Sequence, residues 1–260
     1  MIYGAKKDPY KPDVVSKMGA AVLPDEVDMS EYLPGARYQQ SLNACVGFAV
    51  GAQLTGLAKK RGVYTEWFSP MWVWNGARFI EGTLTENVGV YPRDAFDWIK
   101  EKGSLLEQFW RFTGQMDASA PSSEDSVEAK KLPIIERYRV TGNQNDICSA
   151  LAQGNFVCIG TPWFAEWETI FPDGKLPVAT KKSRVGGFHE TLLYGYDRKA
   201  GMFKGLNSWG LVWGRLGHYD MPFESFDIFG TFGGWDAMYC TVPWPEQPKK
   251  KCWLKSLFKT

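Results

Sequence analysis

Apolar residues in the first half of the chain recur at the three- to four-residue spacing of amphipathic helices. The clearest run begins at Cys45 and stops at Gly62, with basic residues in the last turn, where the helix dipole favours them. Ser69 and Pro70 are typical of the cap and first position of a second helix. Residues 91–103 repeat the amphipathic pattern and end at a glycine. The pattern therefore predicts a mainly helical first half.

Three glycines interrupt the run that begins at Cys45, at positions 47, 51 and 56. Glycine lowers helix propensity, so a helix that keeps three of them needs another reason to have them. We expect neighbouring elements to pack closely against this helix.

The second half changes to short β-rich stretches that are separated by Gly, Asp and Pro, which predicts antiparallel strands. These stretches are NFVCIGTPW, ETLLYGYDR, MFKGLNSWG and GHYDMP. Residues 114–130 are polar and rich in turn formers, so we expect a surface loop between two lobes. A cleft between a helical lobe and a β-rich lobe is a natural place for a functional site.

These patterns divide the chain into four parts of an α+β protein. The segment LPDEVDMSEYLP, residues 23–34, fits a strand or an irregular lead-in within the first part. The expected parts are an N-terminal arm (1–35), a helical lobe (36–130), a β-rich lobe (131–245) and a basic C-terminal tail (246–260).

The charge balance and the apolar runs of the chain bear on its partners and its location. The 30 basic and 29 acidic residues nearly cancel, so nothing in the charge favours a nucleic-acid partner. The N-terminus lacks the apolar stretch of a signal peptide, and no run of 18 apolar residues occurs. We therefore expect no integral membrane segment and a cytoplasmic protein, with a phage virion as the alternative location.

The five cysteines, at positions 45, 148, 158, 240 and 252, are an odd number and form no CxxC pair. This spacing argues against a disulfide framework and against a zinc cluster. We expect reduced thiols, most of them in the core, and no metal.

Cys45 at a helix start is either a packed core thiol or a nucleophile. A nucleophilic cysteine needs a base, donors for the developing oxyanion, and a residue that orients the base. The chain has two histidines, His189 and His218, and we expect the second to be a surface strand residue. Asn207 follows His189 by 18 residues, and Gln39 lies six residues before Cys45.

Three segments around these residues resemble the papain-like (C1) cysteine peptidases. QQSLNACVGFAV is similar to the nucleophile segment of that family, HETLLYGYD to its histidine segment, and NSWGLVWGRLGHY to its NSWGxxWGxxG motif. The histidine and asparagine lie 144 and 162 residues after the cysteine, slightly beyond the roughly 130–150 typical of papain. The resemblance runs from about Leu23 to about Tyr219, favours the bacterial and phage members, and implies the two-lobe papain-like fold.

The resemblance also implies a role for each residue and needs no cofactor. Cys45 would be the nucleophile, with its thiolate stabilised by the helix dipole and by His189. His189 would then protonate the leaving amine and activate water. Asn207 would orient the imidazole with Trp209 shielding that contact, while Gln39 and the Cys45 N–H would bind the oxyanion.

Four further residues are expected to contact substrate: Gly89, Val90, Phe188 and Trp209. Val90 stands where the family has a second glycine, so we expect a narrower subsite. Glu190 follows the histidine where alanine is usual. It raises the proton affinity of the imidazole, binds a basic group of the substrate, or points outward and does neither. These departures leave the catalytic set intact.

The two ends of the chain each leave alternatives open. Only 38 residues precede Gln39, fewer than the long inhibitory propeptide of secreted relatives. The enzyme is then either constitutively competent or restrained by its arm or by a partner. The tail, PEQPKKKCWLKSLFKT, is a solvated segment, a docking segment for a partner protein, or a membrane-surface segment.

We therefore expect a cysteine-type peptidase that acts on proteins or peptides. One alternative is a catalytically weak papain-like module with a binding or structural role, for instance in a phage particle. Another is a cysteine-dependent amidase or acyltransferase that uses the same four residues.

Overall fold

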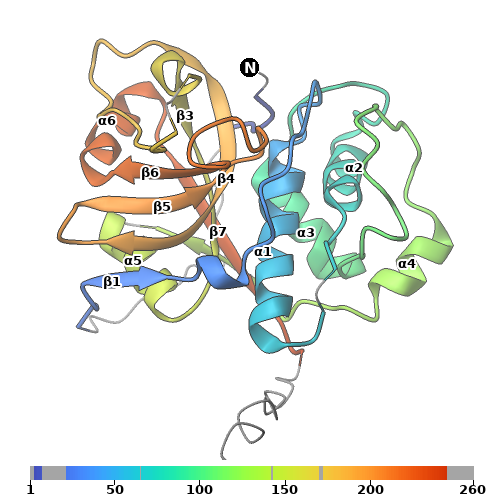
Figure 1. Cartoon of the computed structure of the whole chain (residues 1–260). Coiled ribbons are helices and arrows are strands. Elements are labelled where there is room, and N and C mark those ends of the chain that lie inside the picture. The colour runs from blue at the N-terminus through green and yellow to red at the C-terminus, as the bar shows by residue number, and fades with distance from the viewer. Residues whose placement is uncertain (1–2, 8–21, 65, 142, 170–171, 245–260) are drawn as a thin grey trace, which may run out of the picture.

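The computed structural model describes the chain except for residues 1–2, 8–21, 65, 142, 170–171 and 245–260. It has two lobes, and Figure 1 shows α1, α2, α3 and α4 on one side with the strands, α5 and α6 on the other. The predicted docking role of the C-terminal tail falls outside the described residues and stays a prediction. None of the described helices is long and apolar enough to cross a membrane.

The helical lobe contains the three helices that the sequence predicts, and a fourth. They are α1 (Cys45–Arg61), α2 (Pro70–Glu81), α3 (Pro92–Lys102) and α4 (Ser123–Ala129). The Ser69 side chain accepts a hydrogen bond from the N–H of Trp72, as an N-cap does, and Pro70 is the first helical residue. Gly62 ends α1 in the left-handed conformation at a φ of 69°.

The glycines of α1 allow the close packing that the sequence predicts. A Cβ atom at Gly47 would lie 2.4 Å from the carbonyl oxygen of Pro70, the first residue of α2. A Cβ at Gly56 would lie 2.9 Å from the ring of Phe156, which precedes β3. α1 is buried from Cys45 to Ala58, between the other helices and the sheet.

The β-rich lobe is an antiparallel sheet in the order β2-β7-β3-β4-β5-β6, with β1 paired to β4. The strands are β1 (Glu26–Asp28), β2 (Glu136–Val140), β3 (Val157–Phe164), β4 (Val185–Asp197), β5 (Met202–Leu206), β6 (His218–Pro222) and β7 (Asp236–Thr241). The remaining helices are α5 (Gln144–Ala152), α6 (Phe226–Phe229) and the 3-10 turns η1 (Ser30–Tyr32), η2 (Ala165–Trp167), η3 (Phe223–Ser225) and η4 (Gly230–Phe232). The central strand β4 packs on α1.

Two short helices correct the sequence prediction. Residues 114–130, expected as a loop, include α4, whose cap is Ser122 accepting from the N–H of Asp125. α5 lies within the half predicted as strands and begins with a capping box at Asn143. Each helix has a local cap signal but only a short apolar pattern, so composition alone did not reveal it.

Within the expected arm, 1–35, β1 pairs with β4 of the β-rich lobe. Cys45, Cys148, Cys158 and Cys240 are buried free thiols. His218 lies half-buried on β6, with its Nδ1 3.1 Å from the hydroxyl of Tyr194.

Candidate active site

Cys45 is the first residue of α1, and its side chain faces the β-rich lobe. The residue before it, Ala44, places no side-chain cap on the helix, so the positive end of the helix dipole acts on the thiol. The sulfur accepts a hydrogen bond of 3.4 Å from the backbone N–H of Glu190, the residue directly after His189. Packing of α1 on β4 therefore brings the cysteine and the histidine strand together.

The tautomer of His189 follows from the contacts of Asn207. The Oδ1 atom of Asn207 accepts a 2.7 Å hydrogen bond from the N–H of Ser208, which identifies it as the carbonyl oxygen of the amide. The same oxygen lies 2.7 Å from Nε2 of His189, so Nε2 carries the proton and donates it. The Nδ1 lone pair is then available for a proton, and Nδ1 has no hydrogen-bond partner among the described residues.

Two tryptophans hold the imidazole. The ring of Trp209 lies 4.7 Å from that of His189 at an angle of 30°, and Trp163 packs its edge against it at 4.9 Å. Trp209 is a residue that the sequence singles out, whereas Trp163 was missed because it lies on β3, away from the three motifs. Both rings are buried and keep water from the His189–Asn207 hydrogen bond.

Gln39 is fixed by residues of both lobes. Its Oε1 accepts a 2.6 Å hydrogen bond from the Ser208 hydroxyl, and its Nε2 donates one of 2.8 Å to the carbonyl of Leu42. The amide has two N–H groups, and the bond to Leu42 uses one. The two hydrogen bonds, to Ser208 and Leu42, hold Gln39 rigidly in the chain segment that leads into Cys45.

Burial keeps the thiol and the imidazole neutral. It raises the pKa of Cys45 to about 12, an effect that the Glu190 carboxyl reinforces and backbone N–H contacts oppose. It lowers the pKa of His189 to about 4, against the hydrogen bond to Asn207. The thiolate–imidazolium pair that the sequence predicts is thus disfavoured in this closed arrangement.

The chain itself covers these groups with residues 3–7, which we call the N-terminal segment. Ala5 forms a parallel bridge with Val90. The Val90 N–H donates to the Gly4 carbonyl at 3.0 Å, and the Lys6 N–H donates to the Val90 carbonyl at 2.9 Å. The Ala5 N–H donates to the carbonyl of Phe188 at 3.3 Å, so the segment joins the two lobes.

Glycines let the N-terminal segment lie close to the site. A Cβ at Gly89 would lie 2.5 Å from the Gly4 carbonyl oxygen, and one at Gly187 would lie 2.6 Å from the Tyr3 ring. Tyr3 packs edge-on against the rings of His189 and Trp209, at 6.1 and 6.0 Å. Its hydroxyl is hydrogen-bonded to Glu168.

The four residues predicted to contact substrate all lie against this segment. They are Gly89, Val90, Phe188 and Trp209. We call the surface that these four residues form the groove. Sequence reasoning missed the segment that occupies it, because no local pattern in residues 3–7 indicates where they bind.

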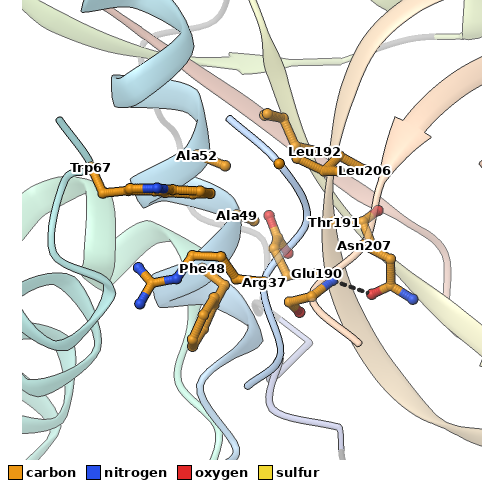
Figure 2. Close-up of a pocket in the computed structure, with 12 residues that line it drawn as sticks. Arg37, Phe48, Ala49, Ala52, Trp67, Glu190, Thr191, Leu192, Leu206 and Asn207 are labelled. Atoms are coloured by element: carbon orange, nitrogen blue, oxygen red, sulfur yellow. Dashed lines mark hydrogen bonds between the residues drawn. The ribbon is translucent and has the colours of Figure 1, made fainter. Parts of the chain in front are cut away.

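Glu190 departs most clearly from the expected pattern. Figure 2 shows its side chain where the lobes meet, near Ala49 on α1, Thr191 on β4 and Asn207, which directly follows β5. Burial raises the pKa of Glu190 well above its usual range; Asp236 adds to the shift and Arg139 opposes it. Burial dominates the lowered pKa of His189, and the group that opposes this effect is Asn207.

Comparison with known sequences gives one relative of limited similarity. No protein-family model matches the chain. A peptidase C1-like protein of Acanthamoeba polyphaga mimivirus is 22% identical over 197 residues, which are 72% of this chain and 63% of the relative. The chain thus spans less than two thirds of the length of that relative.

Solved structures are similar over most of the chain. Xylellain, a cysteine protease from Xylella fastidiosa, has a TM-score of 0.82 and 22% identity, covering 92% of this chain and 95% of its own. Procathepsin L 3 of Tenebrio molitor has a TM-score of 0.66 and 18% identity over 92% and 75% of the two chains. Bromelain from Ananas comosus has a TM-score of 0.64 and 20% identity over 85% and 100%.

These neighbours confirm the predicted fold, and they confirm the resemblance to the C1 family as a likeness of fold. All of them are less than 25% identical to this chain, so the likeness concerns the architecture.

Proposed function

Because the chain has the papain-like fold, we propose that it is a cysteine-type peptidase with Cys45 as nucleophile, His189 as base and acid, and Asn207 as the group that orients the imidazole. One observation carries the proposal: the 2.7 Å contact between His189 Nε2 and Asn207 Oδ1 leaves Nδ1 as the proton acceptor. A core thiol would require neither this tautomer nor Gln39 held beside it.

The reaction follows from these positions. Nδ1 of His189 takes the thiol proton, and the sulfur of Cys45 attacks the peptide carbonyl carbon. Gln39 and the Cys45 backbone N–H stabilise the oxyanion, each donor contributing about 3 kcal/mol. The imidazolium returns the proton to the leaving amine, and a thioester forms. Water then gives one proton to His189 and attacks the thioester carbonyl, and the C–S bond breaks to release the acid. The imidazolium returns its proton to the departing sulfur, which restores the thiol and the neutral imidazole.

The groove must open before a substrate can reach Cys45. The N-terminal segment uses the backbone groups of Val90 and Phe188, and the sulfur is fully buried. Departure of residues 3–7 would hydrate both Cys45 and His189, which removes the desolvation that keeps them neutral. This supports the alternative in which the arm restrains the enzyme, over the one in which it is constitutively competent.

Labelling with an epoxide thiol inactivator tests the proposal without a known substrate. We expect the adduct at Cys45 alone, and loss of labelling in His189→Ala. The matched control is His218→Ala, which removes the other histidine and should label at the parent rate. A digest of a peptide library then tests for cleavage of peptide bonds.

Two outcomes would favour the other functions. An unlabelled Cys45 in a folded variant that lacks residues 1–7 would favour a binding or structural module. Labelling without cleavage of any peptide in the library would favour an amidase or acyltransferase.

A further inference from the structure

A cavity lies beside the groove and shares Phe188 with it. Its volume is 160 Å³, close to the roughly 150 Å³ of an engineered cavity that holds benzene. The strand residues Arg139, Gly160, Glu190 and Asp236 line it, together with Lys7 of the N-terminal segment. The cavity is large enough for one long side chain of a bound peptide.

The Glu190 carboxyl group is buried without a hydrogen-bond partner among the described residues. The residue is 1% exposed, and neither side-chain oxygen has a hydrogen-bond partner among the described residues. Gly160, its partner on β3, leaves the space that the carboxyl occupies, because a Cβ there would lie 2.6 Å from Oε2. Burying a carboxyl group without a donor is costly, so this position favours a ligand that supplies one.

The charges around the cavity leave an acidic excess on the strands. Arg139 is ion-paired with Asp236, with 2.6 Å between Nη1 and Oδ1. Glu190 adds a second carboxyl group to this pair. The other titratable groups that act on Glu190 or are affected by it are Cys45, Cys158 and Tyr219, none of which is a cation. Among the described residues that line the cavity, the further basic side chains are Lys6 and Lys7 of the N-terminal segment, and Lys6 is ion-paired with Glu81.

We propose that the cavity is a subsite for a positively charged side chain of the substrate, lysine or arginine, with Glu190 as its specificity-determining residue. The inference rests on the proposed peptidase function, and it names the substrate class of that same site. An ammonium or guanidinium group has only donors, and its positive charge would favour the ionised form of Glu190, whose oxygens only accept.

The N-terminal segment already brings a cation to the mouth of the cavity. Lys7 lines it, and a Cβ at Gly233 would lie 3.4 Å from Lys7 Nζ. The neighbouring Lys6 turns away instead, to an ion pair with Glu81 and to the face of Tyr91. A peptide that replaces the segment would therefore bring its own basic side chain to the place where Lys7 lies.

Binding and turnover of paired peptides test this subsite. The peptides carry lysine or norleucine, which has the same straight chain but no ammonium, at each of four positions before the scissile bond. Both measurements use the full-length chain with Gly4→Ala, which should open the groove. Binding is measured by calorimetry in the double variant Gly4→Ala, Cys45→Ala, and turnover is measured in the single variant Gly4→Ala. We expect lysine to be preferred at one position by about tenfold, the scale of a charge-assisted hydrogen bond.

Glu190→Gln in both chains should reduce that preference, expressed as the ratio of lysine to norleucine peptide, to within about twofold. The ratio is the readout because both peptides meet the same thiol, whose pKa the Glu190 carboxyl also affects. Glu166→Gln is the matched control, because Glu166 is an exposed acid of the same lobe, and it should keep the preference. A thermal melt of each variant shows that it is folded.

The outcomes separate this subsite from the proposed function. Peptides that are cleaved without a lysine preference, or with one that survives Glu190→Gln, would overturn the subsite and leave the peptidase intact. Unlabelled Cys45 together with no binding of any peptide would overturn the peptidase and the subsite with it. Binding that depends on Glu190 without any cleavage would support the subsite and refute the peptidase alone.

Discussion

Replacing Gly4 by alanine should release the N-terminal segment from the groove. A Cβ at Gly4 would lie 2.0 Å from the carbonyl oxygen of Asn43 and 2.8 Å from its Cα, and backbone atoms cannot turn aside as a flexible side chain can. Gly4 is not among the glycines with positive φ, so its backbone conformation is one that alanine can also adopt. The substitution therefore acts on the contact between the segment and the backbone of Asn43, and so pushes the segment away from its place in the groove.

The magnitude follows from the hydrogen bonds that hold the segment. Its residues Gly4, Ala5 and Lys6 form three backbone hydrogen bonds to Val90 and Phe188. At about 1 kcal/mol each, these stabilise the closed state by about 3 kcal/mol, which corresponds to a factor of about 100. The side-chain contacts of Tyr3 and Lys6 add to this value, and the ordering of the segment opposes it. The groove of the parent would then be open about 1% of the time, and the rate of any reaction at Cys45 would fall by the same factor.

The assay is the rate at which the epoxide inactivator labels Cys45, followed by mass spectrometry. We expect Gly4→Ala, and deletion of residues 1–7, to raise this rate by up to about 100-fold. Gly230→Ala is the control, because no atom lies within 4 Å of a Cβ at that position. If both opened variants melt like the parent and label at the parent rate, the segment does not close the groove and the reasoning is refuted.

Three more predictions concern the catalytic centre. Gln39→Ala in the Gly4→Ala background should lower kcat about 100-fold with little change in KM, because the amide acts on the oxyanion; a change confined to KM in steady-state kinetics would contradict this. Alkylation of Cys45 by iodoacetamide should reach its half-maximal rate at a lower pH in Gly4→Ala than in the parent, because burial raises the pKa of the closed thiol to about 12; identical pH profiles would count against it. Burial raises the pKa of Glu190 in the folded state, so above the usual carboxyl pKa the folded chain binds more protons than the unfolded chain. The free energy of unfolding therefore falls as the pH rises in that range, by at most about 1.4 kcal/mol per pH unit. Glu190→Gln should remove this loss and raise the free energy of unfolding at pH 7, and urea titrations at pH 4 and pH 7 that show no difference from the parent would refute it.

Helices whose ends carry local signals were predictable from the sequence. Ser69 caps α2 through a residue three positions away, and Gly62 ends α1 through its own backbone conformation. Such signals depend on a few neighbouring residues, so they survive in any tertiary context. The caps of α4 and α5 are of the same kind, at Ser122 and Asn143, and could have revealed those helices had they been weighed above composition.

The sequence by itself determined the catalytic candidates and their order, because the spacing around Cys45, His189 and Asn207 is a property of the chain. Only the tertiary structure decided their state. Packing of α1 on β4 buries the thiol and the imidazole, and desolvation by distant residues makes both neutral.

The position of the N-terminal segment and the cavity at Glu190 likewise belong to the tertiary structure. Gly4 meets Val90, and Glu190 meets Gly160 and Asp236, although these residues lie far apart along the chain. A sequence pattern shows which side chains are neighbours within one helical turn or one strand. The exposure and charge of a group depend on every atom packed around it, and those atoms come from both lobes.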